Sequence, residues 1–403
     1  METLQKGAQI PLEIVTPALS PENPDILTSV EALAAALPGI DPSRLNQMTS
    51  IAAKYSFRLP RFYVENILTR AADDPLWELV LPNDGELYDS GTERWDAFQL
   101  ADKVVDHPRW IQKYRYESLL RVTDYCSGLC RYCYLKNRDV TPGTITHAEI
   151  DNMFDMAERS AGLGDLREII LSGGDPLAVG AGVISHLAQR LRRLNQRVGR
   201  RITVCIHTRE PVWYPQRLLR STAMQQAVTE LAPSSYILHV VHPREVTPAL
   251  LESLDMLVHL TPARPPLLMT QHPLFRGINN DAGVITQMYD LLDSGRVTVM
   301  PYYLIHPFPD GTLPQHRLTL PESQGILRGL ASAPGTRVPL LTIPTPMGKC
   351  VIGPYEQLVD RGGYYLLHTK DGVPVHYSIG ERYNPEEIRQ AIPVVKDVTA
   401  DAR

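Results

Sequence analysis

Three of the five cysteines in the chain lie on one short stretch, at Cys126, Cys130 and Cys133. Their C-x3-C-x2-C spacing follows a strand-like run, Ser118 to Thr123. Three thiolates on one loop leave a tetrahedral zinc site one ligand short. They can instead bind three irons of a 4Fe-4S cube and leave the fourth iron without a protein ligand. The spacing therefore predicts an iron-sulfur centre with one iron open to chemistry.

Two other uses of these thiols stay open on the sequence. A structural zinc site would need a fourth ligand from Cys205, Cys350 or a histidine elsewhere. A disulfide pair would leave one of the three thiols over. Both alternatives use three closely spaced cysteines poorly, so the spacing favours the cluster.

The cysteine spacing, with the aromatic Tyr132 before the last cysteine, resembles the signature of the radical S-adenosylmethionine (SAM) superfamily. That resemblance implies that the open iron binds the amino and carboxylate groups of SAM. It also implies that the reduced cluster cleaves SAM to a 5'-deoxyadenosyl radical. By the same resemblance Gly173, Gly174 and Asp175, which follow the next predicted strand, help to hold the SAM amino group. On its own this tripeptide is also what an ordinary β-α turn contains.

Further motifs resemble the lysine 2,3-aminomutase family, in the family's order and near its spacing, over roughly residues 60 to 380. The resemblance implies a second cofactor, pyridoxal 5'-phosphate (PLP), bound through a lysine, and a 1,2-migration of an amino group. The segments that carry it are Ser172–Leu177, Thr208–Val212, Pro215–Arg217, His242–Thr247, Gln271 with Leu274–Asn279, and Pro301–Leu304.

The position that matches the family's lysine is Lys349, for which the alternative reading is a solvated surface lysine. Tyr114 matches the family's PLP-binding segment, and Lys113 keeps its positive charge. Glu117 stands where the family has an arginine suited to a phosphate, which an acid would repel. Arg209 matches a family position and is expected to help hold the SAM carboxylate or the PLP phosphate.

The expected substrate determinants depart from those of the family. Where the lysine mutases place an arginine for the substrate carboxylate, this chain has Leu135. The lysine mutases also have acidic residues that receive the distal ammonium of lysine. At the matching positions this chain has Phe308 and the segment Ile343–Thr345, which contain no acid, although Asp310 could supply one. Burying an unpaired ammonium is costly. The resemblance therefore predicts amino migration on an amino acid other than free lysine.

Two alternative functions remain open. One keeps the cluster and SAM but drops PLP, giving radical oxidation, epimerisation or elimination on a small molecule. The other is a non-enzymatic iron-sulfur binding module. For the enzyme readings the expected partners are a small-molecule substrate, an amino acid by resemblance, and a reductant such as flavodoxin or ferredoxin. A homo-oligomer is expected by analogy with the family.

Around the cysteines, strand-like runs alternate with helical patterns, which is typical of β-α units around a parallel sheet. We expect an α/β fold, a partial (β/α)6 TIM-like barrel of the radical SAM type, with reactive groups at the carboxyl ends of its strands. Residues 1–115 should form an N-terminal arm and helical region, 116–335 the barrel, and 336–403 a small C-terminal β module with the candidate PLP lysine. The predicted strands are residues 119–123, 168–172, 202–207, 236–241, 256–261 and 297–304.

The composition is that of an ordinary globular protein, with 43% hydrophobic and 21% charged residues. A formal net charge of -5 argues against nucleic-acid binding, which needs a basic face. The sequence shows neither a basic segment followed by an apolar core at its start nor an apolar run long enough to span a bilayer. No membrane association and a cytoplasmic location are therefore expected.

Overall fold

The computed structural model describes residues 23–71, 73–88, 107–112, 114–137, 143–159, 164–307, 313–332 and 338–378. Its main element is a nine-stranded sheet, built from strands along much of the chain. These strands are β3 (Trp110–Ile111), β4 (Glu117–Thr123), β5 (Glu168–Gly173), β6 (Thr203–Thr208), β7 (Ser235–Leu238), β8 (Leu267–Pro273), β9 (Val299–Ile305), β10 (Leu340–Thr345) and β11 (Gly348–Ile352).

The order of the strands across the sheet is β11-β10-β9-β8-β7-β6-β5-β4-β3. Strands β4 to β10 run parallel to one another, and the edge strands β3 and β11 are antiparallel to their neighbours. This confirms an α/β protein with a large, mainly parallel sheet. Within the described residues the two edge strands do not pair, so the sheet is open, and the partial-barrel form stays a prediction.

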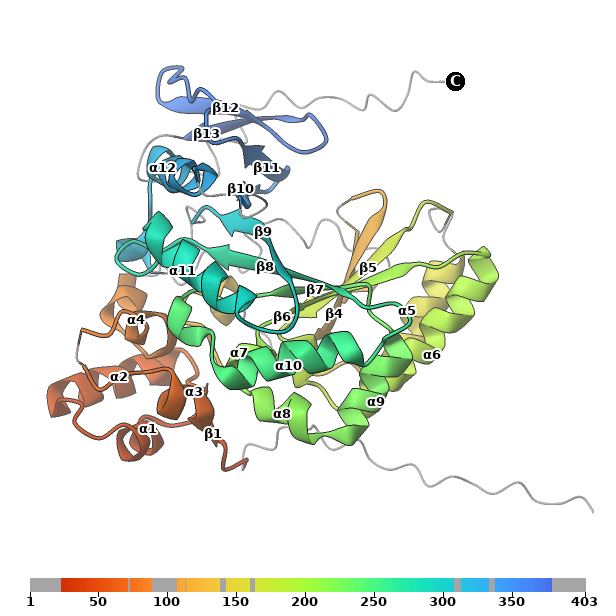
Figure 1. Ribbon diagram of the computed structural model, residues 1–403, viewed down its shortest axis with the longest axis horizontal. Coiled ribbons are helices and arrows are strands. Elements are labelled where there is room, and N and C mark those ends of the chain that lie inside the picture. The colour runs from red at the N-terminus through yellow and green to blue at the C-terminus, as the bar shows by residue number, and fades with distance from the viewer. Residues whose placement is uncertain are drawn as a thin grey trace, which may run out of the picture.

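Helices between the parallel strands cover one face of the sheet (Figure 1). Consecutive strands are neighbours and β-α-β crossovers are right-handed, so the connecting helices fall on the same side. In the described part of the chain, no helix is both long and apolar enough to cross a bilayer. The helices are α5 (His147–Arg159), α6 (Ala181–Val198), α7 (Glu210–Trp213), α8 (Pro215–Arg220), α9 (Thr222–Leu231), α10 (Pro248–His259), α11 (Ala282–Asp293) and α12 (Leu320–Ala331).

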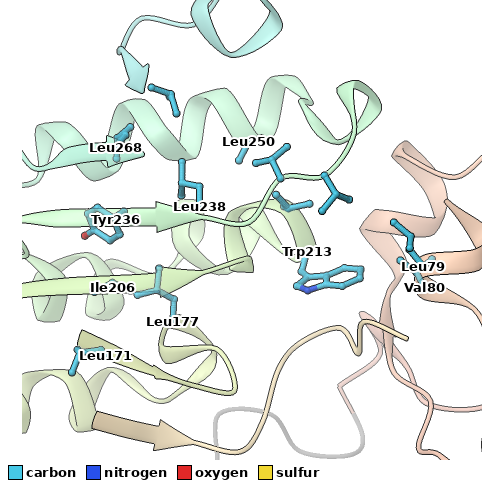
Figure 2. Packing of buried hydrophobic residues seen from close by; sticks show 14 of the residues in the cluster. Leu79, Val80, Leu171, Leu177, Ile206, Trp213, Tyr236, Leu238, Leu250 and Leu268 are labelled. Atoms are coloured by element: carbon cyan, nitrogen blue, oxygen red, sulfur yellow. The ribbon is translucent and has the colours of Figure 1, made fainter. Parts of the chain in front are cut away.

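The hydrophobic core lies between the sheet and these helices. Strand residues such as Ile206 and Leu238 point into it and are fully buried (Figure 2). Successive side chains of a strand point to opposite faces of the sheet. Residues that alternate with the core positions therefore lie on the other side, which we call the polar face. It carries Cys205, His207, Ser235, His239 and Lys349.

The N-terminal region packs beside the carboxyl ends of the parallel strands (Figure 1). Two of its helices are capped as their sequences predict, because Ser29 accepts a hydrogen bond from Ala32 N and Asp41 accepts one from Ser43 N. The elements are β1 (Ile26–Leu27), α1 (Val30–Ala36), α2 (Pro42–Lys54), β2 (Leu59–Pro60), α3 (Arg61–Asn66) and α4 (Trp77–Val80).

One predicted strand, residues 256–261, is wrong. This segment completes α10, whose N-cap Thr247 accepts a hydrogen bond from Leu250 N and is followed by Pro248 at the first helical position. Leu250, Leu254 and Leu257 then recur at helical spacing and are buried. The next strand is β8, which begins further along at Leu267. Short apolar runs do not by themselves distinguish a strand from the end of a buried helix.

The C-terminal part joins the main sheet before forming a hairpin of its own. Strand β10 pairs in parallel with β9, and β11 turns back antiparallel along β10. The predicted hairpin follows as β12 (Tyr364–His368) and β13 (Pro374–Ser378), which pair antiparallel. Gly372 in its turn has a φ of 80°, a conformation that glycine adopts readily.

A buried ion network joins the N-terminal region to the segment that carries the cysteines. The carboxylate of Glu86 pairs with Arg131 at 2.6 Å and with Lys136 at 2.8 Å, and all three side chains are almost fully buried. Arg131 also donates to the carbonyl of Ser56 at 2.8 Å. The single carboxylate of Glu86 therefore pairs with two cations, and all three groups are shielded from water.

We predict that Glu86→Ala destabilises the protein by about 3–5 kcal/mol, because it leaves two buried cations without their counter-charge. Unfolding in urea, followed by circular dichroism, measures the loss. Glu65→Ala is the matched control, since Glu65 forms an exposed pair with Arg61 at 3.8 Å and should change stability by no more than about 0.5 kcal/mol. Equal losses in the two variants would contradict the prediction.

Candidate active site

The cysteine loop follows β4 and is held by the N-terminal region. Leu129 N donates to the carbonyl of Arg58, and Arg131 N donates to the carbonyl of Leu79, both at 2.8 Å. The guanidinium of Arg58 donates to the carbonyl of Cys126 at 2.9 Å and lies over the Tyr125 ring. A loop without regular structure thus satisfies its backbone polar groups through the residues that cover it.

Among the described residues, neither the three loop cysteines nor Cys205 and Cys350 form a disulfide bond. Burial is the main cause that raises the pKa of each loop thiol, to about 11 for Cys133, and neighbouring loop thiols raise the pKa of Cys126 further. Within the described residues, no three His, Cys, Asp or Glu side chains converge closely enough to hold one metal ion. The assignment of the three cysteines to a cluster therefore stays a prediction.

The paired glycines bring the end of β5 against the start of the cysteine loop. Gly173 has a φ of 113°, and Gly174 N donates to the carbonyl of Thr123 at 2.6 Å. A Cβ on Gly174 would lie 2.1 Å from the carbonyl oxygen of Tyr125. The glycines are needed here because one backbone passes directly over another.

Asp175 is buried, and its carboxylate is engaged within the protein. It accepts hydrogen bonds from Arg209 N at 2.6 Å, from the Thr208 hydroxyl at 2.7 Å and from Leu177 N at 3.0 Å. Burial raises the pKa of this carboxyl, and these hydrogen bonds oppose the effect. Asp175 thus ties the end of β5 to the end of β6, and its predicted contact with the SAM amino group stays a prediction.

Arg209 lies beside the cysteine loop but already has a counter-charge. Its guanidinium pairs with the buried carboxylate of Glu245, lies over the Trp213 ring, and donates to the carbonyl of His239 at 3.1 Å. Its positive charge lowers the pKa of the Cys130 thiol. The residue is therefore placed to stabilise a thiolate, whereas its binding of a SAM or PLP anion stays a prediction.

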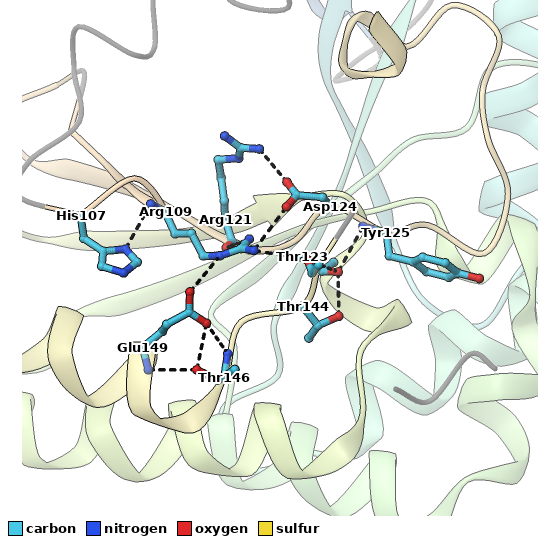
Figure 3. Close-up of polar contacts among 10 residues, drawn as sticks. His107, Arg109, Arg121, Thr123, Asp124, Tyr125, Thr144, Thr146 and Glu149 are labelled. Atoms are coloured by element: carbon cyan, nitrogen blue, oxygen red, sulfur yellow. Dashed lines mark hydrogen bonds and ion pairs between the residues drawn. The ribbon is translucent and has the colours of Figure 1, made fainter. Parts of the chain in front are cut away.

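A second polar network, which the sequence did not reveal, fixes the first residues of the loop (Figure 3). Asp124 pairs with Arg121 at 2.6 Å and with Arg109 at 3.3 Å. The hydroxyl of Thr123 accepts a hydrogen bond from Tyr125 N at 3.1 Å. Arg109 lies about fifteen positions upstream of Asp124, and no motif spacing connects the two, so only the fold brings them together.

Lys349 lies on the polar face, near Tyr114. Its backbone N–H donates to the Tyr114 hydroxyl at 3.3 Å, and its ammonium lies 4.5 Å from the centre of the Tyr303 ring. Burial first, and then the charge of Lys370, lower the pKa of Lys349 to about 8, although Glu117 acts in the opposite direction. Among the described residues this ammonium has no hydrogen-bond or ion-pair partner. Lys349 is therefore a half-buried lysine whose amine is shielded from water and has a lowered pKa, and its role as the PLP lysine stays a prediction.

Two histidines lie between Arg209, which is beside the cysteine loop, and Lys349. Burial, Arg209 and Lys349, in that order, lower the pKa of His239 to about 4. Burial, His239 and Lys349 lower the pKa of His207 well below its usual value. Both imidazoles are therefore neutral at pH 7. Nε2 of His239 and Oε1 of Gln271 are buried without a hydrogen-bond partner among the described residues, so they are available to a ligand.

The other residues that the sequence analysis named for the site are described only in part by the structure. Lys113, Phe308 and Asp310 lie outside the described residues. Leu135 is half-buried, and its neighbour Lys136 is committed to Glu86 and to the Tyr55 ring. Neither Leu135 nor Lys136 therefore offers a positive charge that a substrate carboxylate could use.

Comparisons with known proteins find relatives of similar sequence. No family model matches the chain. An Aquifex aeolicus protein assigned by name to L-lysine 2,3-aminomutase is 26% identical over 336 residues, which cover 82% of this chain and 86% of that protein. The L-lysine 2,3-aminomutase of Haemophilus influenzae is 29% identical over 269 residues, which cover 63% and 72%. A radical SAM methyltransferase structure from Sphaerobacter thermophilus matches with a TM-score of 0.39 and 15% identity over 58% of this chain and 67% of that one, too distant to define the fold.

The three-cysteine loop follows a parallel strand, β4, and the curated relatives that the chain resembles are enzymes named as L-lysine 2,3-aminomutases. The chain is thus similar to proteins named as L-lysine 2,3-aminomutases along much of its length, at 26–29% identity in these examples.

We predict that Gly174→Ala displaces the cysteine loop, because the added Cβ meets backbone atoms of Tyr125 that cannot move independently. The variant should retain less iron and sulfide after anaerobic reconstitution and should unfold at lower temperature. Gly325→Ala in α12 is the matched control, because its Cβ would meet no atom within 4 Å. That change should leave the iron content unaltered and stabilise the helix by up to about 1 kcal/mol. Full iron loading in Gly174→Ala would refute the packing argument.

Proposed function

We propose that the protein moves an amino group between adjacent carbons of an amino acid other than free lysine, using a 4Fe-4S cluster, SAM and PLP. One observation carries the proposal: Arg209, whose charge acts on the Cys130 thiol, and Lys349 both act on the same neutral histidine, His239. The relatives named as lysine 2,3-aminomutases support the reaction class.

The residues present fit the cluster and the lysine-bound cofactor. Cys126, Cys130 and Cys133 would hold three irons, and the raised pKa of each thiol would be overcome by iron binding, because the thiolate is the ligand. Lys349 would hold PLP, since its amine is buried and its pKa is near 8. When bound, the cluster with SAM supplies a 5'-deoxyadenosyl radical, and PLP supplies an aldehyde that holds the migrating nitrogen.

The chain's own residues would contribute position, exclusion of water and proton state. The N-terminal region contacts the cysteine loop and holds its main chain in place. Arg209 would offset the negative charge of the Cys130 thiolate, and Glu245 holds Arg209 in place. His207 and His239 stay neutral, so they do not oppose a cationic amine between the two centres. Lys349 keeps a useful unprotonated fraction near neutral pH.

The surroundings of the site argue against free lysine as the substrate. Leu135 offers no charge for the substrate carboxylate, and Lys136 beside it is neutralised by Glu86. The segment Ile343–Thr345 on β10 provides no acid for a distal ammonium. Enclosing that ammonium without a partner would oppose binding, so a substrate without one is favoured.

The cofactors can be tested separately in anaerobically reconstituted protein. We expect the wild type, given SAM and a reductant, to form 5'-deoxyadenosine and, given PLP, to show a visible absorbance band. Lys349→Ala should lose that band but still cleave SAM. Cys126→Ala should lose both the iron and the cleavage of SAM. Cys350→Ala, which removes a buried cysteine from the hydrophobic core, should keep its iron.

Each failure points to a different function. An active enzyme that binds no PLP would support the PLP-independent radical reaction instead. A fully loaded cluster that yields neither 5'-deoxyadenosine nor methionine from SAM would leave only the iron-sulfur binding module. Turnover of free lysine comparable to that of other amino acids would overturn the substrate assignment while leaving the reaction class intact.

A further inference from the structure

Lys370 is held next to Lys349 by the packing of the C-terminal hairpin onto β11. Its backbone N–H donates to the carbonyl of Lys349 at 3.0 Å. The preceding residue, Thr369, forms an antiparallel bridge with Cys350. A Cβ on Gly348 would lie 3.2 Å from the Thr369 side chain, so the turn sits closely against the strand. The position of Lys370 relative to Lys349 is therefore set by main-chain contacts.

Both lysine side chains meet at one aromatic ring. The Lys370 ammonium donates to the Tyr303 hydroxyl and lies 5.1 Å from the centre of the Tyr303 ring. The Lys349 ammonium lies 4.5 Å from the centre of the same ring. Tyr303 is held in turn by Tyr302, which stacks on it at 3.7 Å and donates to its hydroxyl at 2.8 Å. Two positive charges thus share one buried side chain.

Few groups near Lys349 offset this repulsion. The charged or titratable groups that act on it are Lys370, Glu117 and the Cys205 thiol, and of these only Lys370 opposes protonation. His207 and His239 face it as neutral imidazoles. The Tyr114 hydroxyl accepts from its backbone N–H, and burial raises the pKa of that phenol.

We propose that Lys370 is a positioning residue for Lys349: anchored on Tyr303, it repels the Lys349 ammonium and so raises the fraction of that amine that is unprotonated and ready to add to an aldehyde. The addition forms a C=N bond between the Lys349 nitrogen and the carbonyl carbon. The carbonyl oxygen leaves as water and takes both amine protons, so no further reactant is needed. The identity of the aldehyde as PLP rests on the proposed function.

Competitive labelling with acetic anhydride tests the coupling in the full chain. Mass spectrometry of the peptide that contains Lys349 gives its reactivity from neutral to alkaline pH. The wild-type midpoint should lie near 8. Lys370→Met should move the midpoint to higher pH, and a pKa higher by about 0.5 would lower the labelling rate at pH 7 about threefold. Lys370→Arg should retain the wild-type midpoint, because it keeps the charge.

A matched control and a second variant keep the result interpretable. Lys54→Met removes another lysine that lies over a tyrosine ring, at 4.8 Å from that of Tyr55, and should leave Lys349 unchanged. If Lys370→Met does not fold, Tyr303→Phe keeps the ring but removes the hydroxyl that anchors Lys370, and it should shift the midpoint in the same direction. An unchanged midpoint in folded Lys370→Met, or in Tyr303→Phe, overturns the proposal.

The outcome also separates this proposal from the proposed function. Wild-type protein that shows the shifted midpoint but gains no absorbance with PLP would refute PLP as the aldehyde and leave the coupling of the two lysines intact. Protein that binds PLP through Lys349 with no dependence on Lys370 would refute the coupling alone.

Discussion

The structure depends on how the cysteine loop is held, because this loop has almost no regular structure of its own. Its main-chain groups are satisfied from two sides, by Arg58 and Leu79 of the N-terminal region and by the glycine segment after β5. Beneath them, the buried pairing of Arg131 with Glu86 connects the loop to the helices that cover it. These contacts fix the main chain of the loop, and a fixed main chain is what the proposed cluster would need from its three cysteines.

The strand residues of the candidate site come from one of the two faces of the sheet. Ile206 and Leu238 face the helices and form the core, so the alternate positions Cys205, His207 and His239 lie on the opposite face. Polar residues on that face have lost water without gaining full sets of hydrogen bonds. Their pKa values shift toward the neutral forms for this reason, and Lys349 follows the same rule.

Several residues that the sequence predicts to contact ligands also have partners within the protein, which give them a structural role. Asp175 and Arg209 are both committed to protein partners, the first to main-chain donors and a hydroxyl and the second to Glu245. Their residue types predict ligand contacts, but their surroundings show that they also hold the two strand ends together. Residues at the edge of a site often serve its architecture, and motif matching does not separate the two roles.

The sequence by itself predicted the cysteine loop and the α/β class, because these depend on local spacing and on an alternation of strands and helices, whereas Lys349 was predicted from the resemblance to a known family. It placed one strand wrongly at 256–261, since a short apolar run at the end of α10 has no local feature that distinguishes it from a strand. Only the tertiary structure decided that Lys370 joins Lys349 on Tyr303, and that Arg109 and Arg121 share Asp124. These contacts join different elements of the fold. They depend on burial and on short distances between charged groups, which spacing along the sequence does not reveal.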